Sequence, residues 1–164
     1  MRKNLELKKE KNKLSNIRSE LEESERSKSV FLDNLPGMAY RCKYDRDWTM
    51  LFVSKGCFEL TGYDAESLLH NNKLSYNQII LPKYQEYLWN KWDEVVRSRG
   101  KLKEEYEIIT ASGEIKWVYE QGQAIYDADG SVISLEGLII DITSRKKREE
   151  EIKYMAEHDY LTGL

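Results

Sequence analysis

The chain has 164 residues, of which 40% are hydrophobic and 34% charged, with a formal net charge of −3. This length suits one domain with helical extensions, and the slight acidity argues against a nucleic-acid-binding surface. No apolar run is long enough to cross a bilayer, no secretory signal opens the chain, and Cys42 and Cys57 lack metal-ligand spacing, so we expect a cytoplasmic protein with reduced thiols.

Residues 1–28 contain no Pro or Gly and are rich in Lys, Glu, Arg and Leu. Leu7, Leu14 and Leu21 recur every seven residues, and Ile17 follows Leu14 by three. This spacing predicts a helix with a narrow apolar seam, as in a coiled coil. We expect Leu14, Ile17 and Leu21 to contact a second copy in a homodimer. The alternative is a solvated helix that docks on its own domain.

Residues 29–143 have the pattern of a mixed domain, in which short polar turns separate strands and helices. The expected elements are strands at 38–44 and 49–53, short helices ending at Leu60 and Leu69, a helix at 82–99, and strands at 102–110, 115–126 and 132–140. Two strands, several helices and three strands at hairpin spacing predict an α+β domain. Its five-stranded antiparallel sheet should carry the helices on one face.

A charged helix is predicted over residues 144–158. Its first turn carries Arg145, Lys146 and Lys147, whose positive charges oppose the helix dipole. A contact beyond local preference must therefore hold this exit helix. Packing against a partner helix is the simplest candidate.

Several segments resemble a PAS sensor domain, in the order and at the spacing of that family. They are Asn34–Tyr40, Phe52–Ser54 with Phe58–Tyr63, Gly113–Val118, and Gly137–Thr143 with its Asp-Ile-Thr signature. The resemblance covers residues 29–143 and implies the PAS fold. It also implies that Asp141 and Thr143 tie the last strand to the exit helix, so that a shift in the sheet redirects the helix. Ordinary capping of the helix by Thr143 is the alternative.

The run Ala156–Leu164 resembles the first residues of a GGDEF domain, the diguanylate cyclase fold, which we expect to begin over 159–164. The signature loop would follow Leu164, so no catalytic residue and no metal ligand are expected in this sequence. We therefore expect a non-enzymatic PAS sensory module of a cyclic-di-GMP signalling protein. Its dimeric exit helix would pass a signal to a C-terminal diguanylate cyclase. The alternative is a ligand-free PAS module for dimerisation or protein docking.

The resemblance leaves the cofactor unknown, because PAS domains bind haem, flavin, small organic acids or nothing. The two histidines, His70 and His158, lie outside the long helix where haem-binding relatives place theirs. Lys73 stands where light-sensing flavin relatives require Cys. Apolar side chains replace the polar ones that would face the flavin ring, at Ile108, Val118 and Ile139. Each unpaired polar group would cost roughly 1–3 kcal/mol, so both His-ligated haem and light-sensing flavin are disfavoured.

Alternation along the strands divides their side chains between two faces. Facing the helices we expect Tyr106, Ile108, Val118, Glu120 and Ile139, and with Tyr40 and Trp92 these would line a small pocket or fill the core. On the opposite face we expect Trp117, Tyr119, Leu138 and Ile140, covered by the N-terminal helix of this chain or of a partner. A register shift of one residue would exchange the faces. Glu120 could pair with a cationic ligand or Arg41, or reach solvent.

Overall fold

The computed structural model describes residues 1–162 and divides after Leu35 into two compact units. The first unit is one helix, α1 (Arg2–Asn34), and none of its residues is buried. It continues past the predicted end at residue 28 and stops just before Pro36, which has no N–H to donate within a helix. The seam is solvent-exposed: Leu14 is 68%, Ile17 60% and Leu21 58% exposed.

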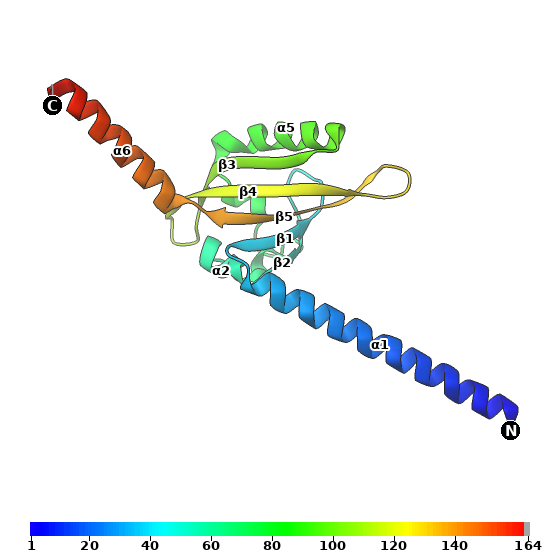
Figure 1. Ribbon diagram of the computed structural model, residues 1–164. Coiled ribbons are helices and arrows are strands. Elements are labelled where there is room, and N and C mark those ends of the chain that lie inside the picture. Colours follow the sequence, from blue (N-terminus) through cyan, green and yellow to red (C-terminus); the bar gives the residue numbers. More distant parts are fainter. Residues whose placement is uncertain (163–164) are drawn as a thin grey trace. The chain divides into compact units, whose positions relative to one another are not determined.

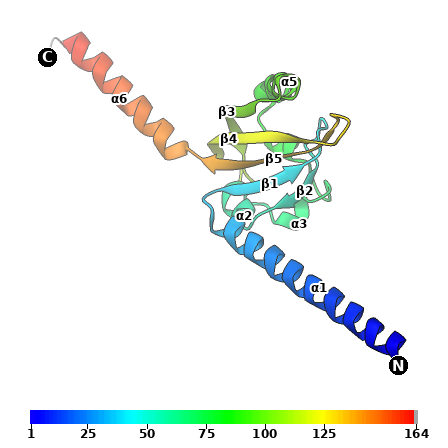
Figure 2. The same cartoon turned by 45° about the vertical axis from the view of Figure 1, so that its right-hand side comes forward.

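The second unit contains a five-stranded antiparallel sheet in the order β2-β1-β5-β4-β3 (Figures 1 and 2). The strands are β1 (Met38–Cys42), β2 (Met50–Val53), β3 (Lys101–Ile109), β4 (Ile115–Tyr126) and β5 (Val132–Asp141). The α+β prediction is confirmed, and every predicted strand is present with small differences at its ends. The last strand pairs with both β1 and β4, so the two halves of the sheet join through β5.

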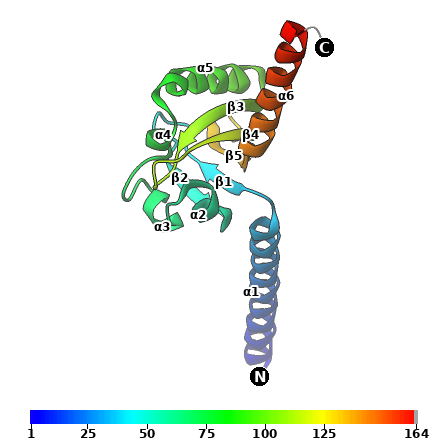
Figure 3. The same cartoon turned by 90° about the vertical axis from the view of Figure 1, so that its left-hand side faces the viewer.

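Four helices gather on one face of this sheet (Figure 3). They are α2 (Gly56–Thr61), α3 (Ala65–Leu68), α4 (Tyr76–Ile79) and α5 (Pro82–Ser98). Helix α4 was not predicted from the sequence. It is closed by a capping box in which Ser75 and Gln78 exchange hydrogen bonds with each other's backbone.

The core lies between the sheet and these helices, and the strand register there agrees with the prediction. Tyr106, Ile108 and Val118 are fully buried, and Ile139 and Glu120 are 1% and 5% exposed. The four side chains expected on the opposite face, Trp117, Tyr119, Leu138 and Ile140, are each half-buried. That α1 of this chain or a partner covers this face stays a prediction.

The exit helix α6 (Thr143–Thr162) begins directly after β5. It continues past residue 158 over the first residues that resemble a GGDEF domain, and Gly163 and Leu164 of that run lie outside the described residues. Within residues 1–162, no helix is both long and apolar enough to cross a bilayer.

Candidate functional site

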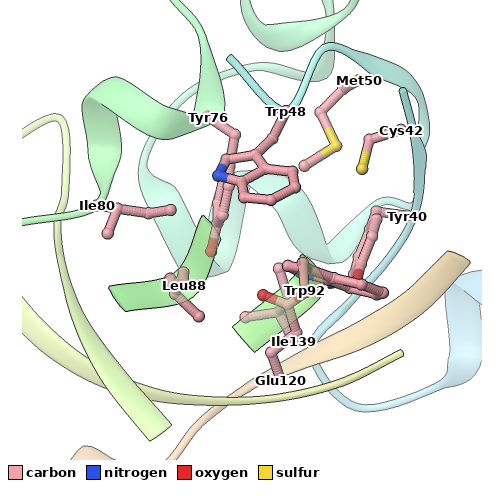
Figure 4. Close-up of a pocket in the computed structure, with 10 residues that line it drawn as sticks. All are labelled: Tyr40, Cys42, Trp48, Met50, Tyr76, Ile80, Leu88, Trp92, Glu120 and Ile139. Atoms are coloured by element: carbon pink, nitrogen blue, oxygen red, sulfur yellow. Dashed lines mark hydrogen bonds between the residues drawn. The ribbon is translucent and has the colours of Figure 1, made fainter. Parts of the chain in front are cut away.

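A small cavity opens between the sheet and the helices (Figure 4). Its volume of about 10 Å³ is near the lower limit for holding one water molecule. Ten residues line it: Tyr40, Cys42, Trp48, Met50, Tyr76, Ile80, Leu88, Trp92, Glu120 and Ile139. Figure 4 shows Tyr40, Trp92 and Glu120 together on one side, and Trp48, Met50 and Cys42 on the other.

Four of the predicted pocket residues line this cavity: Tyr40, Trp92, Glu120 and Ile139. The other three, Tyr106, Ile108 and Val118, are buried but do not line it. Sequence reasoning missed the remaining lining residues. Tyr40 and Cys42 are two apart on β1, and Trp48 and Met50 are two apart beside β2, so strand alternation was the available signal. Tyr76 lies on α4, whose existence was itself missed.

A buried carboxylate, that of Glu120 on β4, is the polar centre of the site. The Tyr40 hydroxyl donates to its Oε2 at 2.5 Å, and the Tyr106 hydroxyl donates to its Oε1 at 2.6 Å. The Trp92 side chain also hydrogen-bonds this carboxylate. The Tyr76 and Tyr106 hydroxyls lie 2.8 Å apart, which extends the network to α4. Side chains from β1, β3 and α5 therefore converge on one group of β4, and α4 joins them through Tyr106.

Burial is the largest influence on the pKa values of the groups in this network. Loss of solvent raises the pKa of Glu120, although the hydrogen bonds from Tyr106, Tyr40 and Trp92 oppose that rise. Burial, together with the nearby Glu120, raises the pKa of both Tyr40 and Tyr106 well above the ordinary value. Burial likewise raises the pKa of the Cys42 thiol. The tyrosines and the thiol therefore stay protonated, and both hydroxyls are available as donors.

Of the alternatives considered for Glu120, pairing with Arg41 is excluded. Arg41 lies on the opposite face of β1, because it alternates with the inward Tyr40. Its guanidinium pairs instead with Glu136 of β5, with Nη2 2.8 Å from Oε1. Glu120 does not reach solvent either, since it is only 5% exposed.

Two glycines make room for the network on the sheet. Gly122 of β4 and Gly137 of β5 are paired across the two strands. A Cβ on Gly137 would lie 2.7 Å from the Tyr40 hydroxyl and 2.4 Å from the Gln121 carbonyl oxygen. A Cβ on Gly122 would lie 2.9 Å from the Trp92 ring. Tyr40 and Trp92 can therefore lie against the sheet only because these positions carry no side chain.

The junction between β5 and α6 is held by hydrogen bonds to β4. The Thr143 Oγ1 accepts from the Trp117 backbone N–H at 3.0 Å. One Asp141 carboxylate oxygen, Oδ1, accepts from both the N–H and the hydroxyl of Thr143 at 2.9 and 2.6 Å. The Ile142 N–H donates to the Trp117 carbonyl at 2.8 Å. Asp141 and Thr143 thus bind the start of the helix to the neighbouring strand.

The basic first turn of α6 is held by contacts within the same chain, whereas its packing against a partner helix stays a prediction. Glu105 of β3 contacts Arg145 Nη2 at 2.5 Å and Lys146 Nζ at 2.6 Å. The Lys146 ammonium also lies over the Trp117 ring, 4.6 Å from its centroid. The hydrogen bonds from Lys146 and Arg145 lower the pKa of Glu105, although partial burial acts in the opposite direction. Sequence reasoning missed Glu105, because its partners lie about 40 residues away.

Among the described residues, no group of three or more His, Cys, Asp or Glu side chains is arranged to hold a metal ion. Cys42 and Cys57 are free and buried. The candidate site is therefore the cavity, with its carboxylate and aromatic walls, together with the junction of β5 and α6.

Comparison with known proteins gives the sequence relatives of this chain. A family model described as the PAS fold matches residues 50–139, more than half of the chain. The methyl sulfide methyltransferase-associated sensor of Methanosarcina acetivorans is 32% identical over 109 residues, which cover 64% of this chain and 10% of that sensor. The aligned segments span only 9–10% of the curated relatives that match.

Several solved structures are similar in fold. The PAS domain of a Colwellia psychrerythraea protein is 21% identical with a TM-score of 0.61, covering 74% of this chain and 97% of that one. The N-terminal domain of a diguanylate cyclase with PAS/PAC sensor from Marinobacter aquaeolei is 15% identical with a TM-score of 0.57, covering 67% and 98%. These likenesses concern the fold alone, whereas the family match rests on sequence. On that match, this chain belongs to the PAS fold family.

Proposed function

We propose that this chain is the sensory module of a cytoplasmic cyclic-di-GMP signalling protein. In this proposal the cavity around Glu120 receives the stimulus, and α6 passes the response to a C-terminal diguanylate cyclase domain. The chain itself performs no chemistry. Its output is a change in the geometry or pairing of the exit helices in a homodimer.

The single observation that carries this proposal is the position of Glu105 beside Tyr106. These residues are adjacent in β3, and their side chains serve opposite faces of the sheet. Tyr106 donates to Glu120 inside the domain, whereas Glu105 pairs with Arg145 and Lys146 at the start of α6. A displacement of β3 that follows a change at Glu120 would therefore change the contacts of the exit helix.

A stimulus can shift the equilibrium between two arrangements of α6 only by the difference in its affinity for those two arrangements. Asp141 and Thr143 limit the motion, because they join the first turn of α6 to the backbone of β4. The hinge is then a short hydrogen-bonded joint between two rigid elements. This is the role that we propose for Asp141 and Thr143.

The nature of the output rests on the resemblance of Ala156–Leu164 to the start of a GGDEF domain. The solved Marinobacter aquaeolei domain, from a protein described as a diguanylate cyclase with PAS/PAC sensor, has the same fold. The direct test is cyclic-di-GMP production from GTP by the parent protein. Glu105→Gln should change that rate severalfold, whereas Glu136→Gln, which removes an ion pair with Arg41, should not. A parent without cyclase activity, or one unaffected by Glu105→Gln, contradicts the proposal.

Dimerisation is proposed through α1, whose seam residues Leu14, Ile17 and Leu21 are exposed in a single chain. Sedimentation of the purified chain over a range of concentrations should give a dimer. The double variant Leu14→Glu, Leu21→Glu should be monomeric, and a matched variant on the polar side of the helix, Glu22→Gln, should not. A monomer at every concentration for the wild-type chain removes the basis of the mechanism.

A second function is favoured by one observation, the small size of the cavity, about 10 Å³. A domain that binds no ligand could serve in dimerisation or protein docking, using the half-buried face that carries Trp117, Tyr119, Leu138 and Ile140. Native mass spectrometry of the purified protein separates the two. A retained small molecule supports the sensory proposal, and a bare polypeptide that no compound stabilises supports the docking module.

A further inference from the structure

We infer that the cavity selects small organic cations, with the Glu120 carboxylate as counter-charge and the surrounding aromatic rings as walls. This inference rests on the proposed sensory function and names the chemical class of the stimulus. It follows from three properties of the cavity: its charge, its aromatic lining and its residual hydrogen-bonding capacity.

The charge that the cavity lining can carry on its acidic or basic side chains is negative. Glu120 is an acidic residue, and none of the described lining residues is Lys, Arg or His. An anionic ligand would meet a carboxylate and no cation in a poorly solvated space, where like charges repel strongly. A cation would instead gain the attraction of Glu120. With Glu120 ionised, the lining therefore disfavours carboxylic acids and phosphates as ligands.

The aromatic lining favours the same class. Four aromatic side chains border the cavity: Tyr40, Trp48, Tyr76 and Trp92. They come from separate elements, and Figure 4 shows them arranged around a common space. Trp48 and Trp92 lie with ring centroids 6.3 Å apart at 45°, so their planes form two inclined walls. Aromatic faces attract cations, and sets of such faces recognise alkylammonium groups.

The hydrogen-bonding capacity of Glu120 is not exhausted by the protein. An ionised carboxylate offers about four lone-pair sites. Tyr40, Tyr106 and Trp92 donate to it, which leaves room for a further donor. Every one of these protein donors is neutral, so the carboxylate has no counter-charge within the network. An ammonium N–H would supply both the missing donor and the missing charge.

The size of the cavity sets the length of the ligand. About 10 Å³ admits one water-sized group, which is the size of an ammonium head. An attached methyl group requires a wall to move. Trp48, which lies in the loop between β1 and β2 rather than in a strand or helix, is one such wall. The inference therefore specifies short ligands, of the methylammonium type, rather than long polyamines.

The test is thermal unfolding of the full chain with probes matched in size and different in charge. Methylammonium chloride is compared with methanol as the neutral isostere, with sodium acetate as the anion, and with potassium chloride as a bare cation at equal ionic strength. We expect methylammonium to raise the melting temperature by about 2–4 °C near saturation, with no comparable rise for the other three. This series uses the wild-type protein and does not depend on any variant folding.

A variant then assigns the effect to the cavity. Glu120→Gln should reduce the affinity for methylammonium at least tenfold, measured by calorimetry. Glu136→Gln, which removes an exposed carboxylate from β5, should leave the affinity unchanged. An equal response to potassium chloride, or a methylammonium effect that survives Glu120→Gln, overturns the inference.

The outcomes also separate this inference from the proposed function. One outcome is that only methanol or acetate stabilises the protein and that mutation of the cavity abolishes this effect. That outcome would refute the cationic class and leave the sensory role intact. Stabilisation by none of the four probes refutes the cation inference. Only the additional failure of Glu105→Gln to change the parent's cyclase rate would remove the sensory role.

Discussion

Glu105 and Tyr106 are consecutive residues of β3 whose side chains hold two different parts of the domain. Tyr106 donates to the buried Glu120 at 2.6 Å, and Glu105 pairs with Lys146 of α6 at 2.6 Å. Because neighbouring residues in a strand point to opposite faces, this pair joins the cavity to the exit helix through one peptide unit.

Replacing Glu105 with Gln should loosen the first turn of α6. The variant leaves Arg145 and Lys146 without their counter-charge beside a helix N-terminus that already disfavours cations. Because the pair is partly exposed, we expect a loss of about 1 kcal/mol or less in global stability. Amide hydrogen exchange in α6 should accelerate. Glu104→Gln, which affects a contact with Tyr87 instead, is the control; equal acceleration in both variants would contradict this role.

The same ion pair gives a pH dependence. The pKa of Glu105 is lowered from its ordinary value of 4.5, so its contribution to stability is present above that value. The contribution is lost as the pH falls through the lowered pKa. Below pH 4.5, amide hydrogen exchange in the first turn of α6 should therefore become faster relative to the intrinsic exchange rate of an unstructured chain. The Glu105→Gln variant should not show this increase. A wild-type profile identical to that of the variant would exclude the ion pair as its cause.

Thr143→Val tests the joint between β5 and α6. The substitution removes the acceptor of the Trp117 N–H and one donor to Asp141. A partly buried N–H left unpaired costs about 1–3 kcal/mol, which urea unfolding would detect. Thr143→Ser keeps the hydroxyl and should lose much less. If Ser and Val are equally destabilising, the methyl group rather than the hydrogen bonds stabilises the joint.

The main features of the fold could be predicted from sequence because each depends on a local pattern. Alternation along β3 and β4 assigned Tyr106, Val118 and Glu120 to the buried face, and all three are buried. The turn sequences located the hairpins on either side of β4. Pro82 and the helical spacing after it located α5.

The contacts of the site could not be predicted, because they join residues far apart in sequence. Nothing near Glu105 indicates that its charge meets Lys146, about 40 residues later, so this contact was not predicted. Arg41 was one of three alternatives considered for Glu120, but strand alternation turns it to the other face and toward Glu136. The size of the cavity depends on how Trp48 and Trp92 pack together, which no periodicity reports.

Glu120→Gln tests the buried carboxylate through the pH dependence of stability. Burial raises the pKa of Glu120, so the native state binds a proton more tightly than the unfolded state. The contribution of Glu120 to stability is therefore fully present below pH 4.5, the ordinary pKa of a Glu side chain. It is lost as the pH rises through the raised pKa of Glu120. The difference in free energy of unfolding, wild type minus Glu120→Gln, should fall across that window by about 1.4 kcal/mol per pH unit. A difference that rises with pH would show that the carboxylate is stabilised in its charged form.

Gly137→Ala should disturb the network without altering any of its polar groups. The new methyl would lie 2.7 Å from the Tyr40 hydroxyl and 2.4 Å from a backbone oxygen, and overpacking of this kind costs about 1–3 kcal/mol. Gly100→Ala is the control, because its methyl meets only the flexible Ser98 side chain. Urea unfolding and the tyrosine fluorescence of the two variants should differ accordingly. Equal stability would mean that Tyr40 does not lie against the sheet at this point.

The most direct measurement is a double-mutant cycle between the two faces of β3. Glu105→Gln and Tyr106→Phe are made singly and together, and the opening free energy of the first turns of α6 is measured by hydrogen exchange. Glu105→Gln combined with Ile108→Val, which alters the same strand outside the network, is the matched cycle. If β3 transmits a change from Glu120 to α6, the coupling is at least about 0.5 kcal/mol in the first cycle and absent in the second. Additive effects in the first cycle would contradict transmission from the cavity to the exit helix.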